Sequence, residues 1–77
     1  MEVKVKLYSE LRNYAPGNSN VFSIALFSGA TVRDLLETLK IPHRVRRFIV
    51  LNGRRGEEGT PLSAGDTVVL FTPVEGG

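Results

Sequence analysis

The stretch from residue 31 to 40 is the one amphipathic helix that the sequence predicts, and it constrains the fold more than any other feature. Thr31 and Asp34 have the spacing of a capping box at its start. Pro42 is expected to end it, because the residue before a proline is pushed out of the α region. The apolar side chains of this helix recur at i, i+3, i+4 and i+7 over about three turns, at Val32, Leu35, Leu36 and Leu39. A helix with one apolar stripe must bury it against another element.

Four stretches outside this helix predict β-strands, at residues 3–7, 21–27, 48–51 and 67–71. The first alternates apolar and charged side chains, which is the period of a strand with one buried face. The second is expected to pair antiparallel with the first. The third runs into Asn52 and Gly53, a strong hairpin turn signal, and Gly65 and Asp66 turn the chain into the last strand.

The order of these elements is strand, strand, helix, strand, turn, strand, with no internal repeat. This order favours an α+β fold in which a mixed sheet of four to five strands packs on one main helix. A chain of 77 residues forms one domain, and a domain of this size buries only roughly 60% of its unfolded surface. So small a core argues against a self-contained enzyme with a deep cleft.

The composition excludes several kinds of chemistry. Cysteine is absent, so disulfides, thiolate zinc sites and thiol catalysis are excluded. The start is charged and then alternating, without the apolar region of a signal peptide, and no apolar run approaches the length of a membrane span. These features predict a cytoplasmic protein that does not enter a membrane.

The last residues of the sequence can add nothing to a core. Pro73 fixes φ and removes an amide donor, so sheet pairing is expected to stop near Phe71 and the rest to project as an extended, flexible tail. Gly76 and Gly77 carry no side chain, which keeps the thread narrow enough to enter a partner's active site. The alternative interpretation is a frayed chain end without a role.

Five motifs along the chain together resemble the ubiquitin-like β-grasp sulfur carriers, and most closely the small subunits of molybdopterin synthase (MoaD/ThiS-like). The resemblance lies in the order and spacing of the motifs, which cover nearly the whole chain. They are LYSELR at residues 7–12, GATVRDLL at 29–36, VLNG at 50–53, PLSAGDTV at 61–68 and FTPVEGG at 71–77.

The resemblance implies a β-grasp domain over residues 1–72 and an extended tail over residues 73–77. It implies that the Gly77 carboxylate is adenylated with ATP on an E1-like enzyme and is then converted to a thiocarboxylate by a persulfide donor. The sulfur would pass to the large subunit of molybdopterin synthase and build the dithiolene of molybdopterin. The chain would then be a non-catalytic carrier subunit that holds no cofactor or metal stably. The residues implied to contact partners are Phe71, Thr72, Pro73, Val74, Glu75, Gly76 and Arg12.

Other acceptors and other roles stay open. Thiamine thiazole or tungsten-pterin synthesis would use the same sulfur chemistry, and a ubiquitin-like modifier would end Gly77 in an isopeptide bond to a lysine. Phe71 is equally well interpreted as an ordinary core residue, because the pattern leaves its face on the last strand undetermined. Arg12 is equally well interpreted as a surface arginine.

Six of the ten basic residues, and no acidic residue, fall within residues 40–55. Such a segment raises the hypothesis of a small RNA-binding or acidic-protein-binding β-grasp module. The charges fall in turns without interleaved aromatic residues, which favours a solvated rim or an acidic-partner contact over nucleic acid. His43 has no acid or cysteine at ligand spacing, and Glu57 and Glu58 have no cleft, so all three are interpreted as surface residues.

Overall fold

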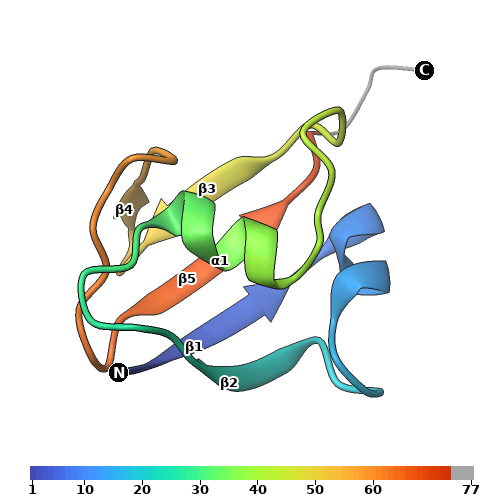
Figure 1. Cartoon of the computed structure of the whole chain (residues 1–77). Helices are drawn as coiled ribbons and strands as arrows, with labels where there is room; N and C mark the ends of the chain where they lie inside the picture. Colours follow the sequence, from blue (N-terminus) through green and yellow to red (C-terminus); the bar gives the residue numbers. More distant parts are fainter. Residues whose placement is uncertain (74–77) are drawn as a thin grey trace.

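The computed structural model describes residues 1–73 as one sheet with one α-helix and one 3-10 helix (Figure 1). The four predicted strands are present, and a fifth strand of two residues completes the hairpin after Asn52 and Gly53. Within residues 1–73 no helix has the length and apolar character needed to cross a membrane. The elements are β1 (Glu2–Leu7), η1 (Ser9–Tyr14), β2 (Val21–Ala25), α1 (Val32–Thr38), β3 (Phe48–Leu51), β4 (Arg54–Arg55) and β5 (Thr67–Phe71).

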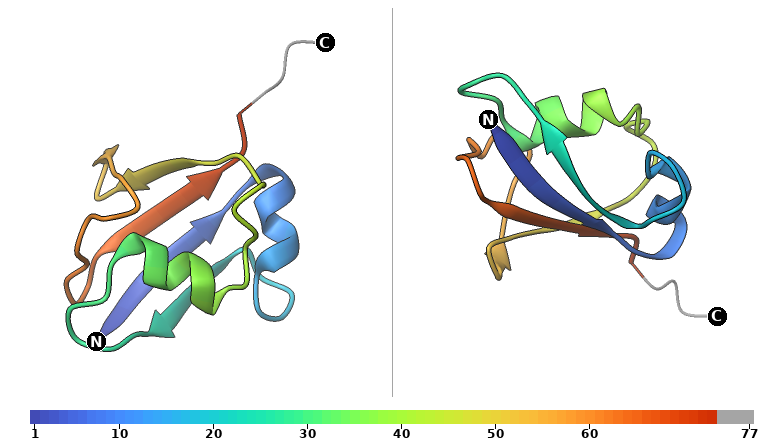
Figure 2. Two further views of the ribbon diagram at one scale, coloured as in Figure 1. Left: turned by 45° about the horizontal axis from the view of Figure 1, so that its top comes forward. Right: turned by 90° about the horizontal axis from the view of Figure 1, so that it is seen from below.

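The last strand of the chain lies in the middle of the sheet. The strand order is β2-β1-β5-β3-β4. β5 runs parallel to β1 and antiparallel to β3, while β1 with β2 and β3 with β4 form antiparallel pairs. Figure 2 shows α1 lying across one face of this twisted sheet. Because β1 and β5 are parallel, their C-terminal ends meet at the end of the sheet opposite to Met1.

The core lies between α1 and the face of the sheet that it covers. Val5 and Leu7 of β1 stand beside Val68 and Leu70 of β5, and all four side chains are fully buried. The core contains no buried polar or charged residue among residues 1–73, so burial of apolar surface is its main source of stability. Its members are Val3, Val5, Leu7, Leu11, Leu26, Ala30, Val32, Leu35, Leu36, Leu39, Ile41, Ile49, Leu62, Val68 and Leu70.

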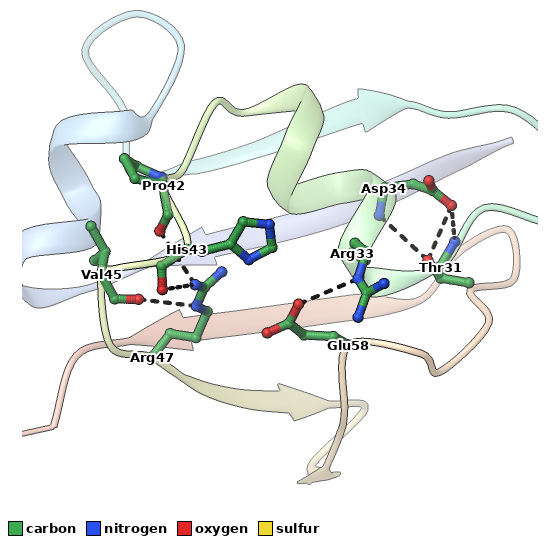
Figure 3. A network of polar contacts seen from close by, with 8 residues as sticks. All are labelled: Thr31, Arg33, Asp34, Pro42, His43, Val45, Arg47 and Glu58. Carbon is green, nitrogen blue, oxygen red and sulfur yellow. Dashed lines mark hydrogen bonds and ion pairs between the residues drawn. The ribbon is translucent and has the colours of Figure 1, made fainter.

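The start of α1 confirms the predicted capping box. The Asp34 amide donates to Thr31 Oγ1 at 3.4 Å, and the Thr31 amide donates to Asp34 Oδ2 at 2.8 Å (Figure 3). The Arg33 amide, also in the first turn, donates to the Glu58 carbonyl at 2.8 Å, and the side chains of Arg33 and Glu58 form an ion pair at 3.5 Å. The first turn of the helix is therefore held both by its own cap and by the loop before β5.

The end of α1 corrects the prediction based on Pro42. The helix covers seven residues, about two turns rather than three, because Lys40 adopts a φ of 60° and reverses the chain. The Ile41 amide then donates to the Leu36 carbonyl and the Lys40 amide to the Glu37 carbonyl, both at 3.0 Å. These two bonds form a Schellman motif, and the buried Ile41 and Leu36 supply its apolar contact. Pro42 follows the stop and does not cause it.

Hydrogen bonds at the Met1 end of the sheet join the turn at residues 52–53 to the turn at residues 65–66. Asn52 has a φ of 51° and Gly53 a φ of 82°, as a type I′ hairpin turn requires. Asn52 Nδ2 donates to Asp66 Oδ1 at 2.9 Å, and the Thr67 amide donates to Asn52 Oδ1 at 2.8 Å. Asp66 also accepts from the Ser63 amide at 2.8 Å. Asp66 is thus a turn former, as predicted, and in addition it fixes β5 against the β3–β4 hairpin.

Candidate functional site

The chain leaves the sheet at the C-terminal end of β5. The strand ends at Phe71, as the sequence predicts, and Thr72 and Pro73 follow as half-buried residues. Pro73 has no amide to donate, so it cannot extend the ladder. The other predicted site residues, Val74, Glu75, Gly76 and Gly77, lie outside the described residues.

Three of the four exposed large apolar side chains within residues 1–73 lie beside this exit, and the fourth, Phe27, lies at the Met1 end. Alternation along β5 turns Leu70 into the core and Phe71 to the face opposite α1, where its ring centroid lies 5.4 Å from that of Phe48. Tyr8 continues β1 in extended conformation, and its amide donates to the Leu70 carbonyl at 2.9 Å. Tyr8 is 42% exposed, Phe48 46% and Val21 41%, and all three lie at the exit end of the sheet. We call Tyr8, Val21, Phe48 and Phe71 the aromatic face.

This arrangement shows which face of β5 Phe71 occupies, and its contact with a partner stays a prediction. The side chain is half-buried against Phe48 and lies on the uncovered face rather than between α1 and the sheet. Apolar side chains that stay exposed at one end of a small domain are typical of a protein–protein contact site. Phe71 is therefore available to a partner that approaches the exit.

A cation borders the aromatic face. The register places Lys6 beside Val69 and Val21 on the uncovered face of the sheet, whereas Lys4 and Arg55 stand on the same face nearer its Met1 end. An apolar centre with a charged border is the usual anatomy of a protein interface. The sign of the border indicates a partner surface with acidic groups around an apolar centre.

A hollow of about 520 Å³ lies next to the exit, a volume within the range of about 300–1,000 Å³ that small-molecule sites occupy. We call this hollow the exit groove. One wall comes from η1 and one from the loop between α1 and β3, and the end of the described chain completes the lining. It is lined by Glu10, Arg44, Val45, Arg46, Thr72 and Pro73.

The loop that carries two of these arginines is braced by a third. Arg47 is half-buried, and its guanidinium donates to three backbone carbonyls of its own loop. The donor–acceptor distances are 3.1 Å to Val45, 3.3 Å to Pro42 and 2.9 Å to His43 (Figure 3). The planar fork of the guanidinium can make these contacts together, which a lysine cannot. Arg47 thus orders the wall of the exit groove.

Arg12, the remaining predicted partner contact, stands apart from the exit groove. It is exposed on η1 and lines a second, polar hollow of about 350 Å³ with residues of the 13–20 segment. That hollow shares no lining residue with the exit groove, where Glu10 is the contribution of η1. The structure therefore brings Phe71, Thr72 and Pro73 together and does not place Arg12 with them.

The basic segment at residues 40–55 does not form one patch. Arg44 and Arg46 lie at the exit, whereas Arg54 and Arg55 lie on β4, which follows the turn at the Met1 end of the sheet. His43 is exposed, and residues 1–73 contain no group of three acidic, histidine or cysteine side chains that could hold a metal ion. Glu57 is exposed and Glu58 pairs with Arg33, which agrees with surface roles.

Sequence reasoning missed Tyr8 and Phe48 as site residues, and it grouped Arg44 and Arg46 with the whole basic segment at residues 40–55 without placing them at the exit. Tyr8 carried a usable signal, because it continues the alternation of residues 3–7 on the polar face, where an aromatic side chain is out of place. Phe48 carried none, because only the pairing of β3 with β5 brings it to the exit.

A five-stranded mixed sheet in this order, with one helix on one face, defines a ubiquitin-like β-grasp domain. The chain belongs to the ThiS family of ubiquitin-like sulfur carriers, which it matches over residues 5–77. No curated protein sequence matches the chain.

Several solved structures share the fold. SAMP1 from Haloferax volcanii is 27% identical, with 100% of each chain covered and a TM-score of 0.81. A protein from Pyrococcus furiosus described as molybdopterin converting factor subunit 1 is 31% identical, with 95% of this chain and 98% of that chain covered and a TM-score of 0.77. Molybdopterin-converting factor from Helicobacter pylori, solved as a complex of subunits 1 and 2, matches at 24% identity with full coverage of both chains and a TM-score of 0.67, which shows the fold alone.

Proposed function

We propose that this chain carries sulfur for molybdopterin synthesis on the carboxylate of Gly77. The observation that carries the proposal is the position of the aromatic face beside Pro73. A partner that covers this face has residues 72–77 within reach. These six residues span about 20 Å when fully extended. The family and the likeness to the Pyrococcus protein support sulfur carriage and favour molybdopterin among the acceptors.

The chemistry needs activation, because a carboxylate is a poor electrophile. A carboxylate oxygen of Gly77 attacks the α-phosphorus of ATP on an E1-like enzyme, pyrophosphate leaves, and an acyl-adenylate forms. The terminal sulfur of a persulfide then attacks the acyl carbon and AMP leaves, and a second thiol cleaves the resulting acyl disulfide to a thiocarboxylate. The partners supply the positioning and the charge stabilisation for these steps.

The roles of the remaining residues follow from this proposal. Phe71, Thr72 and Pro73 contact the partners at the exit, and Val74, Glu75 and Gly76 form the part that enters their active sites. Arg12 contributes a separate contact on η1. The ATP belongs to the activating enzyme, the chain itself holds no cofactor, and the large synthase subunit receives the sulfur in the cytoplasm.

The test is conversion of the purified chain with ATP, the adenylating enzyme of the same organism and a persulfide donor. Intact-protein mass spectrometry is expected to show one oxygen replaced by one sulfur at Gly77. The matched control lacks Gly77 and should keep its unfolding free energy while gaining no sulfur. Full activity of a chain with a tag fused after Gly77 would contradict the proposal. Adding the large synthase subunit and pterin precursor to the sulfurated chain then tests the acceptor, and sulfur transfer only to a thiazole or tungsten-pterin system would reassign the pathway.

The likeness to SAMP1, a small archaeal modifier protein, favours a second candidate function. In this role the activated Gly77 acyl group would be attacked by a lysine amine and end in an isopeptide bond. The readout is the appearance of higher-mass adducts that contain the chain in extracts of its own organism. A Gly77-dependent adduct ladder would support the modifier role, and sulfurated chain without adducts would exclude it.

A further inference from the structure

We infer that the exit groove is a docking site for an acidic segment of the protein that acts on Gly77, with Arg44 as its carboxylate-binding side chain and Arg46 as a second positive charge beside it. Only the identity of that protein rests on the proposed function. The chemical class of the ligand rests on the groove itself.

The charge of the groove favours carboxylates. Arg44 and Arg46 share one wall, and the loop that presents them contains no acidic residue between Lys40 and Arg55. A guanidinium binds a carboxylate through two parallel hydrogen bonds, which gives both strength and direction. Arg44 can hold an acidic side chain of an extended segment in this way, and the charge of Arg46 adds to the attraction.

The wall is ordered before any ligand arrives. Arg47 ties the carbonyls of Pro42, His43 and Val45 together, and the Val45 amide donates to the Pro42 carbonyl at 3.1 Å. Ile41, at the start of the same loop, is buried in the core. A pre-ordered loop loses little conformational entropy on binding, so even a few contacts yield useful affinity.

The opposite wall argues for a protein ligand rather than a nucleic acid. Glu10 faces the groove from η1, and a phosphate backbone with its unbroken negative charge would meet it unfavourably. A protein segment can place a carboxylate against the arginines and a neutral or basic side chain against Glu10. Among residues 1–73, no aromatic side chain on which a base could stack lines the groove, and Phe48 and Phe71 pack on each other on the sheet face.

The groove lies beside the residues that lead into the C-terminal end of the chain. Thr72 and Pro73 form part of its lining, so a segment bound there touches the chain at the root of residues 74–77. Binding at the root would set the direction in which the reactive end leaves the domain. The aromatic face and the exit groove flank the same exit, and one partner can cover both.

The experiment titrates the isotope-labelled chain with octaglutamate at low salt and follows backbone and arginine side-chain signals by NMR. The R44E/R46E variant is compared with R54E/R55E, which makes the same change in net charge at the far end of the sheet. We expect octaglutamate to shift signals of residues 44–46 and 72, and R44E/R46E to weaken binding at least about tenfold while R54E/R55E stays within about twofold. Thermal unfolding of both variants checks that each is folded.

Three results would overturn the inference: equal weakening in both variants, signal shifts spread over all cationic residues, or tighter binding of an oligouridylate of equal charge at the same residues. The last of these would assign the groove to nucleic acid. A chain that binds octaglutamate in the groove but gains no sulfur would sink the proposed function and leave the docking site standing. A chain that gains sulfur but does not bind octaglutamate in the groove would support the proposed function and contradict the docking site.

Discussion

Arginines of this chain with the same chemistry have three different roles, which their backbone positions decide. Arg47 turns its guanidinium onto three carbonyls of its own loop. Arg44 and Arg46 line the exit groove, and Arg54 and Arg55 stand on β4 at the far end. Hydrogen bonds from a charged donor to backbone carbonyls stabilise more than exposed charges do. Only the first role should therefore be visible in stability.

Replacing Arg47 with lysine tests this difference. The charge is kept, but an ammonium group cannot reach the three carbonyls in one plane, so R47K should lower the free energy of unfolding by about 1–3 kcal/mol. Urea denaturation measures the change, and R54K, the matched control, should stay within about 0.5 kcal/mol of the parent. Equal effects of the two variants would show that the Arg47 contacts do not matter.

The element that departs most from its sequence pattern is α1, whose apolar stripe continues past the helix. Leu39 and Ile41 are buried although the helix ends at Thr38, because the Schellman turn folds the chain back onto the core. The turn needs a positive φ at Lys40, a conformation in which a side chain is strained and glycine is not.

Lys40→Gly should therefore raise the free energy of unfolding by about 0.5–1 kcal/mol, since glycine relieves the strain of the left-handed conformation. Lys40→Ala is the control, because it removes the lysine side chain and keeps the Cβ. A gain with alanine as large as that with glycine, measured by the same denaturation, would locate the effect in the lysine side chain instead.

β5 is an element with two faces, and adjacent residues on it should respond differently to mutation. Leu70→Ala removes a fully buried side chain and should cost about 2–5 kcal/mol of stability. Phe71→Ala removes a half-exposed ring whose main contact is Phe48 and should cost about 1 kcal/mol. Phe71→Ala should nevertheless slow thiocarboxylate formation in the partner assay, at a temperature where both parent and variant are folded. Unchanged sulfur transfer in that variant would remove Phe71 from the partner contact.

On the scale of the whole molecule, the fold depends on its last strand. β5 joins the β1–β2 pair to the β3–β4 pair, and without it the sheet would fall into two separate hairpins. Isolated two-stranded hairpins are marginal in water. The same strand also leads directly into the exit, so the part of the molecule that carries the site is anchored in the centre of the sheet.

A chain that ends at residue 66 should therefore show no cooperative unfolding transition, because neither hairpin can keep the core. A chain that ends at residue 73 retains β5 and should unfold with the stability of the parent. Circular dichroism against temperature and the dispersion of amide NMR signals measure both outcomes. A cooperative transition in the shorter chain would show that β5 is dispensable for folding.

Local patterns in the sequence predicted most of the elements. The alternation of residues 3–7, the capping box at Thr31 and the Asn52–Gly53 turn are each encoded in a few neighbouring residues, and the structure confirms them. The predicted end of α1 was wrong, because Lys40 is an uncommon residue at the left-handed position of a Schellman motif. The chemistry proposed for Gly77 also came from the sequence alone, through its resemblance to sulfur carriers.

The sequence by itself determined the four longer strands, the start of the helix, most of the apolar faces, and the end of sheet pairing at Phe71. The tertiary structure decided the strand order, the split of the basic segment into two ends, and the meeting of Tyr8, Phe48 and Phe71 at the exit. The reason is one of range. Propensity, capping and turn chemistry act between neighbours along the chain, whereas the placement of β5 between β1 and β3 depends on which arrangement buries all the apolar faces together.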